Sequence, residues 1–182
     1  MTIYVTSDLH FRHDKIIQVC NRPTTPEEHD AWLIRQINKT VKTHDTVYHL
    51  GDFSFTKNIE DMRNFCNRLN GSWFHVLGNH DDEKRLRKAF EGTRHTIAGN
   101  YHELKYNGRF IMMLHYPMES WNRKRYGSLH LFGHLHTKEI EANVLKPLKN
   151  RKLMSLDSHP EFIPYKLDDI MEEFPVEKKE PA

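Results

Sequence analysis

Five short segments of the chain place metal-binding residue types directly after an apolar run. They are Asp8-Leu9-His10, Gly51-Asp52, Gly78-Asn79-His80-Asp81, His115-Tyr116-Pro117 and Gly133-His134-Leu135-His136. Histidine is the commonest metal ligand, and its side chain exchanges protons near neutral pH. The chain holds 14 histidines in 182 residues, more than packing alone requires. Together the five segments predict a site where carboxylate, amide and imidazole groups hold metal ions.

Each of these segments follows a run with the pattern of a β-strand. Short β-branched or aromatic runs that end near Gly, Asp or Asn are typical of strands. The predicted strands are Ile3 to Ser7, Thr46 to Leu50, Trp73 to Leu77, Phe110 to Leu114, Leu129 to Phe132 and Leu153 to Leu156. Side chains alternate in direction along an extended segment, so Asp8 and His10 point to the same side. His134 and His136 have the same spacing and also point to one side. Each pair of side chains can therefore bind one ion.

Helical patterns separate the first three strands. Thr25 is expected to cap a helix that has Pro26 at its first position. Leu33, Ile37 and Val41 then form one buried stripe, and a second amphipathic pattern precedes the third strand. Strands that alternate with helices predict parallel strands joined by crossover helices.

The second half of the chain changes character. Asn107-Gly108 stands between two strand-like runs and is a strong hairpin signal. We therefore expect mixed sheets, parallel early and antiparallel late, in a single domain over residues 1–174. The polar residues 175–182 are expected to form a frayed tail.

Net charge, hydrophobic runs and cysteine content limit the classes of protein to which the chain can belong. The 27 basic and 25 acidic residues give a net charge of +2, which argues against a long nucleic-acid track. No window approaches 18 apolar residues, and the N-terminus lacks the pattern of a signal peptide, so a cytoplasmic protein with no membrane partner is expected. Cys20 and Cys66 lie far apart in the sequence and are predicted to be reduced core thiols.

The ordered motifs D-x-H, GD, GNHD, a lone His and GHxH resemble those of the calcineurin-like metallophosphoesterase superfamily over about residues 1 to 160. The segments SDLHF, HYP followed by Trp121, and LFGHLH resemble the small single-domain bacterial and phage members. The resemblance implies an α/β fold, a metallophosphoesterase-type two-sheet mixed β-sandwich flanked by α-helices. It also implies a dinuclear metal-dependent phosphoesterase.

The resemblance further implies two ligand sets that share Asp52. One ion would be held by Asp8, His10, Asp52 and His136, and the other by Asp52, Asn79, His115 and His134. A metal-bridging hydroxide would attack phosphorus in line with the leaving oxygen. His80 would be the catalytic residue that stabilises the transition state or protonates the leaving alkoxide. Mixed oxygen and nitrogen ligands suit Mn²⁺, Fe or Zn²⁺, with Mn²⁺ as the first expectation.

Several residues near the motifs are candidates for substrate binding, and each also has a structural interpretation. They are Arg12, His13, Trp121, Arg123 and Arg125. Arg12 stands where related sequences often carry glycine, and His13 could equally precede a helix. The run from Trp121 to Tyr126 lies between two ligand-bearing strand ends, so it is expected to form either a substrate flap beside the metals or a solvated loop.

Four other residues have expected supporting roles. Asp81 is expected either to cap a helix over residues 82–90 or to orient a neighbouring group, and Asp157 is expected to hydrogen-bond a ligand histidine. His49 and His75 lie inside strands and are expected to be hydrogen-bonded core residues.

Several function classes stay open at the level of sequence. The leading hypothesis is hydrolysis of a phosphodiester on a small phosphorylated substrate, with nucleotides among the candidates. The alternatives are a phosphomonoesterase, a nuclease for short oligonucleotides, and a binding scaffold that kept the fold but lost catalysis. A phosphohydrolase of the His-Asp type would be all-helical, which the predicted strands contradict.

Overall fold

Two mixed β-sheets form the body of the protein in its computed structural model, which describes residues 1–136 and 149–175. The first sheet has the order β4-β3-β2-β1-β9. Its strands are β1 (Ile3–Thr6), β2 (Thr46–His49), β3 (Ser72–Val76), β4 (His95–Gly99) and β9 (Tyr165–Lys166). The second sheet has the order β5-β6-β7-β8. Its strands are β5 (Tyr101–Tyr106), β6 (Arg109–Leu114), β7 (Leu129–Phe132) and β8 (Arg151–Leu153).

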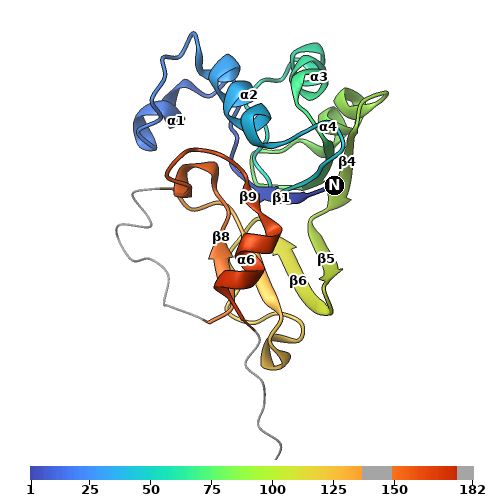
Figure 1. Ribbon diagram of the computed structural model, residues 1–182. Coiled ribbons are helices and arrows are strands. Elements are labelled where there is room, and N and C mark those ends of the chain that lie inside the picture. Colours follow the sequence, from blue (N-terminus) through green and yellow to red (C-terminus); the bar gives the residue numbers. More distant parts are fainter. Residues whose placement is uncertain (137–148, 176–182) are drawn as a thin grey trace, which may run out of the picture.

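Strands β1 to β4 run parallel, and β9 adds to β1 in the antiparallel direction. Three helices cover the outer face of this sheet, and a fourth, α1 (Asp14–Val19), lies beside them (Figure 1). The three are α2 (His29–Thr40), α3 (Ile59–Arg68) and α4 (Glu83–Phe90). The predicted cap at Thr25 is wrong, because α2 begins at His29, and Glu28 before it makes no side-chain cap.

The second sheet confirms one prediction and corrects another. Asn107 and Gly108 join β5 to β6 as an antiparallel hairpin, as expected. However, β6, β7 and β8 are parallel, so the late strands are not antiparallel as a group. The segments between them are long enough for the crossovers that parallel neighbours require. The last strand also differs from the prediction, since β8 ends at Leu153 and Leu156 instead begins the short helix η2 (Leu156–Ser158).

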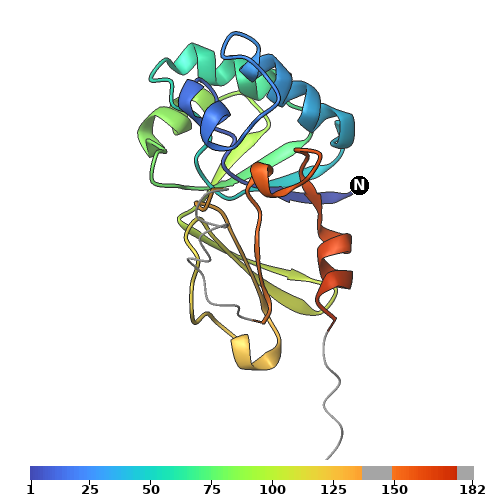
Figure 2. The same cartoon turned by 90° about the vertical axis from the view of Figure 1, so that its left-hand side faces the viewer.

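Alternating side chains of the first sheet supply two separate cores. Tyr4, Val47 and Trp73 pack against the helices. Val5 and Tyr48 point the other way and pack against the second sheet. The helix α6 (Leu167–Glu173) contributes to this inner core, and Figure 2 shows helices above the first sheet and the second sheet below it. The expected two-sheet sandwich flanked by helices is therefore confirmed.

Two expectations concern the C-terminal tail and membrane-spanning segments. The tail predicted over residues 175–182 lies outside the described residues from 176 onwards. Within residues 1–136 and 149–175, every helix is too short or too polar to cross a lipid bilayer.

Candidate metal centre

The loops that follow β1, β2 and β7 carry residues in an unusual backbone conformation. Asp8, His10, Asp52 and His134 all have positive φ angles, of 59°, 55°, 62° and 73°. Residues other than glycine rarely adopt this left-handed backbone conformation. Residues that are held in it occur often at functional sites. Hydrogen bonds between the loops hold it in place: the Asp8 amide donates to Gly51 O at 2.9 Å, and the His10 amide donates to Asp52 O at 3.1 Å.

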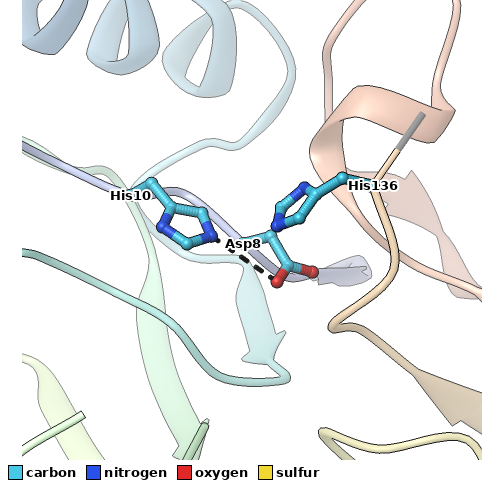
Figure 3. Close-up of side chains that lie close together, drawn as sticks. All are labelled: Asp8, His10 and His136. Carbon is cyan, nitrogen blue, oxygen red and sulfur yellow. Dashed lines mark ion pairs between the residues drawn. The ribbon is translucent and has the colours of Figure 1, made fainter. Parts of the chain in front are cut away.

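The first group of ligand-type atoms comes from Asp8, His10 and His136, which lie within 4.8 Å of one another. Figure 3 shows His10, from the segment after β1, and His136, from the segment after β7, on either side of the Asp8 carboxylate. His10 Nε2 lies 3.8 Å from Asp8 Oδ1. The carboxylate is oriented by the Ser7 hydroxyl, which donates at 2.5 Å, and by the His134 amide, which donates at 3.1 Å.

Asp52 lies at the centre of the site. Its Oδ2 atom is 3.8 Å from His10 Nε2, 3.5 Å from His115 Nε2 and 3.9 Å from His80 Nε2. These separations exceed a hydrogen bond. His10 Nε2 is buried and has no hydrogen-bond partner among the described residues, which is costly for a polar atom. A cation among these atoms would satisfy them, so the residues fit a metal ion.

A second group surrounds Asn79. Its side-chain oxygen lies 2.9 Å from His115 Nε2 and 3.0 Å from His134 Nδ1. His115 Nδ1 lies 2.8 Å from Leu50 O and must donate to that carbonyl. In neutral His115 the Nε2 atom is therefore an acceptor, and it faces the oxygens of Asn79 and Asp52, which are also acceptors. A cation between these three acceptors would satisfy all of them, and the backbone bond orients the imidazole to bind one.

The ionisation of these groups suits metal binding. Burial lowers the pKa of His10 and keeps its imidazole neutral. Burial alone would raise the pKa of Asp8, but the electrostatic interaction with nearby His10, together with His115 and His136, outweighs it and lowers the pKa. His136 differs, because Asp157 and Cys20 overcome the effect of burial and raise its pKa to about 10. Metal binding at His136 would therefore release a proton.

Two glycines let the loops approach each other closely. A Cβ atom on Gly78 would collide with Asp52 Oδ1 and would lie 2.6 Å from the Asp52 amide nitrogen. A Cβ atom on Gly133 would lie 2.6 Å from Ser7 Oγ and 2.7 Å from Asp8 Oδ2. The Asp52 carboxylate thus occupies space that any side chain at position 78 would fill. The Asp8 carboxylate likewise occupies space that a side chain at position 133 would fill.

A family model of the calcineurin-like phosphoesterase superfamily domain matches residues 1–149 of the chain. The chain belongs to this superfamily. It is therefore a member of a family of phosphate ester hydrolases that are generally metal-dependent, and the groups Asp8-His10-His136 and Asp8-Asp52-His115 could each hold a metal ion.

The chain is also similar to other proteins and to a solved structure. The protein MJ1445 of Methanocaldococcus jannaschii is 32% identical over 166 residues, which cover 90% of this chain and 84% of the relative. The gene 66 protein of Mycobacterium phage L5 is 32% identical over 100 residues, or 54% of this chain and 46% of the relative. The crystal structure of AQ665 from Aquifex aeolicus, a protein of unknown function, matches with a TM-score of 0.70 at 22% identity, over 94% of this chain and 98% of that one. At this identity the structural likeness shows the fold alone.

Asp81 holds two loops of the candidate site together, which is the second of the two roles expected for it. Its carboxylate accepts from the amides of Asp52 and Phe53, both at 2.9 Å, and of Gly78 at 2.8 Å. The expected helix cap is instead Asp82, which accepts from the Arg85 amide at 3.1 Å. The cap expected at Asp81 is wrong, whereas the alternative role, orienting a neighbouring group, is the one that its hydrogen bonds support. Its side chain turns back and ties the Gly78 segment to the Asp52 loop.

The mouth of the site is formed by His80 and its aromatic neighbours. The side chain of His80 is 46% exposed, and its amide donates to Asp52 Oδ1 at 3.0 Å. Phe55 packs against His80 with ring centroids 4.5 Å apart and stacks on His13 at 3.7 Å. Phe55 was not predicted, although an aromatic residue three positions after Asp52 was a usable signal. Arg12 turns aside and pairs with Asp30 at 3.2 Å.

The remaining substrate candidates do not join the site. Trp121 is buried, and its indole N–H donates to Ser128 Oγ at 3.1 Å. The Arg123 guanidinium lies 4.3 Å from the ring centroid of Phe110. Phe110 is near the start of β6, whereas His115 follows its end. The flap expected beside the metals therefore lies at the opposite end of the second sheet, together with the short helix η1 (Lys124–Tyr126), which includes Arg125 (Figure 2).

The expected supporting histidine contacts are present. His136 Nδ1 lies 3.5 Å from Asp157 Oδ2, the contact that the sequence suggested for Asp157. His49 and His75 are buried, and their Nδ1 atoms lie 3.2 Å apart. These two residues therefore belong to the core, as expected.

Proposed function

We propose that this phosphoesterase hydrolyses a phosphodiester with the help of two divalent metal ions, of which Mn²⁺ is the first to test. The observation that carries the proposal is the meeting of three acceptor atoms on Asp52, Asn79 and His115, with Asp52 Oδ2 also facing His10. A carboxylate that faces histidines on two sides is suited to lie between two ions.

In this proposal the two ligand sets meet at Asp52. Asp8, His10, Asp52 and His136 would hold one ion, and Asp52, Asn79, His115 and His134 the other. When bound, such a metal pair acidifies a water molecule and polarises the phosphoryl oxygens of the substrate. Nitrogen and oxygen ligands together suit Mn²⁺, Fe or Zn²⁺.

The charge of the site supports an anionic substrate. Two divalent ions bring four positive charges, and the proposed ligands return only the two negative charges of Asp8 and Asp52. The remaining proposed ligands are neutral imidazoles or an amide. The excess positive charge would attract and orient a phosphate ester.

His80 is the proposed catalytic residue. Its imidazole is half-exposed at the mouth, with Nε2 3.9 Å from Asp52 Oδ2, so a substrate can reach it. Packing against Phe55 limits the positions of the ring. In this role His80 would hold a proton and deliver it to the leaving oxygen, as histidine side chains commonly do in general acid catalysis.

The test is an assay of the purified chain with Mn²⁺ on bis-p-nitrophenyl phosphate and on p-nitrophenyl phosphate. We expect turnover of the diester that EDTA abolishes. Turnover of the monoester alone would refute the diester preference and leave a phosphomonoesterase. Absence of EDTA-sensitive turnover of either compound, with no bound metal, would refute the enzyme proposal and favour a non-catalytic scaffold. A panel of cyclic mononucleotides, cyclic dinucleotides and short labelled oligonucleotides would then identify the substrate class and test nuclease activity.

A further inference from the structure

A fully buried arginine lies beneath the loop that carries Asp8. The side chain of Arg22 has no exposed surface, and neither does that of its partner Asp157. Arg22 Nε donates to Asp157 Oδ1 at 2.7 Å, and Nη2 donates to Asp157 Oδ2 at 3.0 Å. Paired bonds of this kind are among the strongest and most directional in proteins. The guanidinium therefore fixes the plane and position of the Asp157 carboxylate.

That carboxylate in turn faces a proposed metal ligand. Asp157 Oδ2, which Arg22 holds, lies 3.5 Å from Nδ1 of His136. A carboxylate beside one ring nitrogen of a ligand histidine favours the proton on that nitrogen and leaves the other for the ion. Arg22 thus reaches His136 through one intermediate side chain.

Arg22 also holds the backbone on the other side of the same ion site. Nη2 donates to Asp8 O at 2.7 Å, and Nη1 donates to Leu9 O at 2.8 Å. Asp8 is one of the residues with a positive φ angle, and a strained conformation persists only where surrounding contacts hold it. The fifth contact, from Nη1 to His29 Nε2 at 2.8 Å, completes the set of partners around the guanidinium.

We propose that Arg22 is a positioning residue for one of the two metal ions, the ion assigned to Asp8, His10, Asp52 and His136. The proposal rests on the proposed function. Within the described parts of the chain, the hydrogen bonds of Arg22 end on Asp8, Leu9, His29 and Asp157. These bonds hold Asp8 directly and His136 through Asp157, and both are ligands of this ion. None of the bonds reaches a residue that is assigned to the second ion alone. Loss of Arg22 should therefore affect the two ions unequally.

A second buried arginine provides a matched control. Arg109 is also buried and donates to Gly127 O at 2.5 Å, to Asn150 Oδ1 at 3.2 Å and to Phe174 O. It begins β6, at the end of that strand away from His115. Replacement of Arg109 by lysine should lower thermal stability to an extent comparable with the same change at Arg22, without an effect on metal binding.

The experiment compares Arg22→Lys and Arg109→Lys with the unaltered chain. Lysine keeps the positive charge but lacks the planar fork that serves a carboxylate and two carbonyls at once. Mn²⁺ per chain is measured by elemental analysis after equilibrium dialysis over a range of Mn²⁺ concentrations. We expect two ions in the unaltered chain and in Arg109→Lys. In Arg22→Lys one ion should bind about 10- to 100-fold more weakly, the usual effect of losing such a supporting contact, while the other keeps its affinity.

Double variants identify which ion is affected. Added to His10→Ala, the Arg22→Lys change should remove no further ion. Added to Asn79→Ala, it should weaken the ion that remains. Asp157→Asn provides a second single variant with the same expected asymmetry, and circular dichroism checks that each variant folds.

Equal weakening of both ions, or unchanged affinities in folded Arg22→Lys and Asp157→Asn, would overturn the positioning role while leaving the proposed function intact. If neither variant folded, both residues would act through overall stability and the positioning role would also be rejected. An unaltered chain that binds no Mn²⁺, Fe or Zn²⁺ would instead refute the proposed function, and the inference with it.

Discussion

The replacement of Gly78 by alanine tests whether the close approach of two loops creates the metal centre. The added methyl group would collide with Asp52 Oδ1 and would lie 2.6 Å from the Asp52 amide nitrogen, which is short of an ordinary 3.4 Å contact by about 0.8 Å. One of these neighbours is backbone, so a side-chain rotation alone does not relieve the collision. Gly78 has no positive φ angle, so the substitution adds no backbone strain of its own.

The expected magnitude follows from this displacement. A shift of about 1 Å in a catalytic group costs roughly 100-fold in rate, or about 2.7 kcal/mol in the activation free energy. We therefore expect Gly78→Ala to lower the turnover of bis-p-nitrophenyl phosphate about 100-fold, with less than two Mn²⁺ per chain. The assays are steady-state kinetics and elemental analysis on the same protein sample.

Gly92→Ala is the matched control. Gly92 has a φ of +74°, and a Cβ atom there would have no neighbour within 4 Å. Alanine at that position should reduce stability by about 1–2 kcal/mol through backbone strain but leave metal content and turnover unchanged. A Gly78→Ala protein that binds two ions and retains turnover within threefold of the original would refute the steric argument.

Three further predictions concern the proposed acid, the remote loop and the response to pH. His80→Ala should keep both ions but lower turnover about 100- to 10,000-fold, with a smaller loss for p-nitrophenyl than for alkyl leaving groups; equal losses for both would contradict the role of proton donor. Arg125→Ala should leave kcat/KM for small diesters unchanged, because η1 lies at the far end of the second sheet, and a tenfold drop in kcat/KM would show that this loop reaches the substrate. Burial lowers the pKa values of several histidines below the unfolded value of 6.5, to about 3 for His29, His49 and His95 and to about 4 for His130. The unfolded chain therefore binds more protons than the folded chain in this pH range. The free energy of unfolding should decrease as the pH falls from about 6.5 towards 4, by up to about 1.4 kcal/mol per pH unit for each histidine. Urea titrations in EDTA that give equal free energies of unfolding at pH 7.5 and 5.5 would contradict this.

The features that were predictable from the sequence depend on local patterns and on the geometry of parallel strands. The carboxyl ends of parallel neighbours meet at one edge of a sheet, so residues after β1, β2 and β3 must lie close together. This reasoning brings Asp8, Asp52 and Asn79 into one region without any knowledge of the second sheet. The Asn107-Gly108 hairpin was predictable for a similar reason, since its turn is specified by two adjacent residues.

The features that were missed depend on contacts between distant segments. β9 is only two residues long and pairs with β1 from the other end of the chain, so it has no periodicity to detect. Trp121 was expected in a loop near the metals, but its indole packs on His130 with ring centroids 5.3 Å apart, and the loop continues to the end of the second sheet away from His115. Arg22 resembles an ordinary surface arginine in the sequence, because its partner Asp157 is 135 positions away.

The distribution of the site over two sheets affects how the protein matures. Asp8, Asp52 and Asn79 belong to loops of the first sheet, whereas His115 and His134 follow strands of the second. A chain emerging from the ribosome exposes the first three long before the last two have been synthesised. With the proposed ligand sets, complete coordination would therefore wait until the second sheet has docked, which would make metal acquisition a late event in biogenesis. Before that stage, the partly formed site would offer only an incomplete set of donors to any cation in its surroundings.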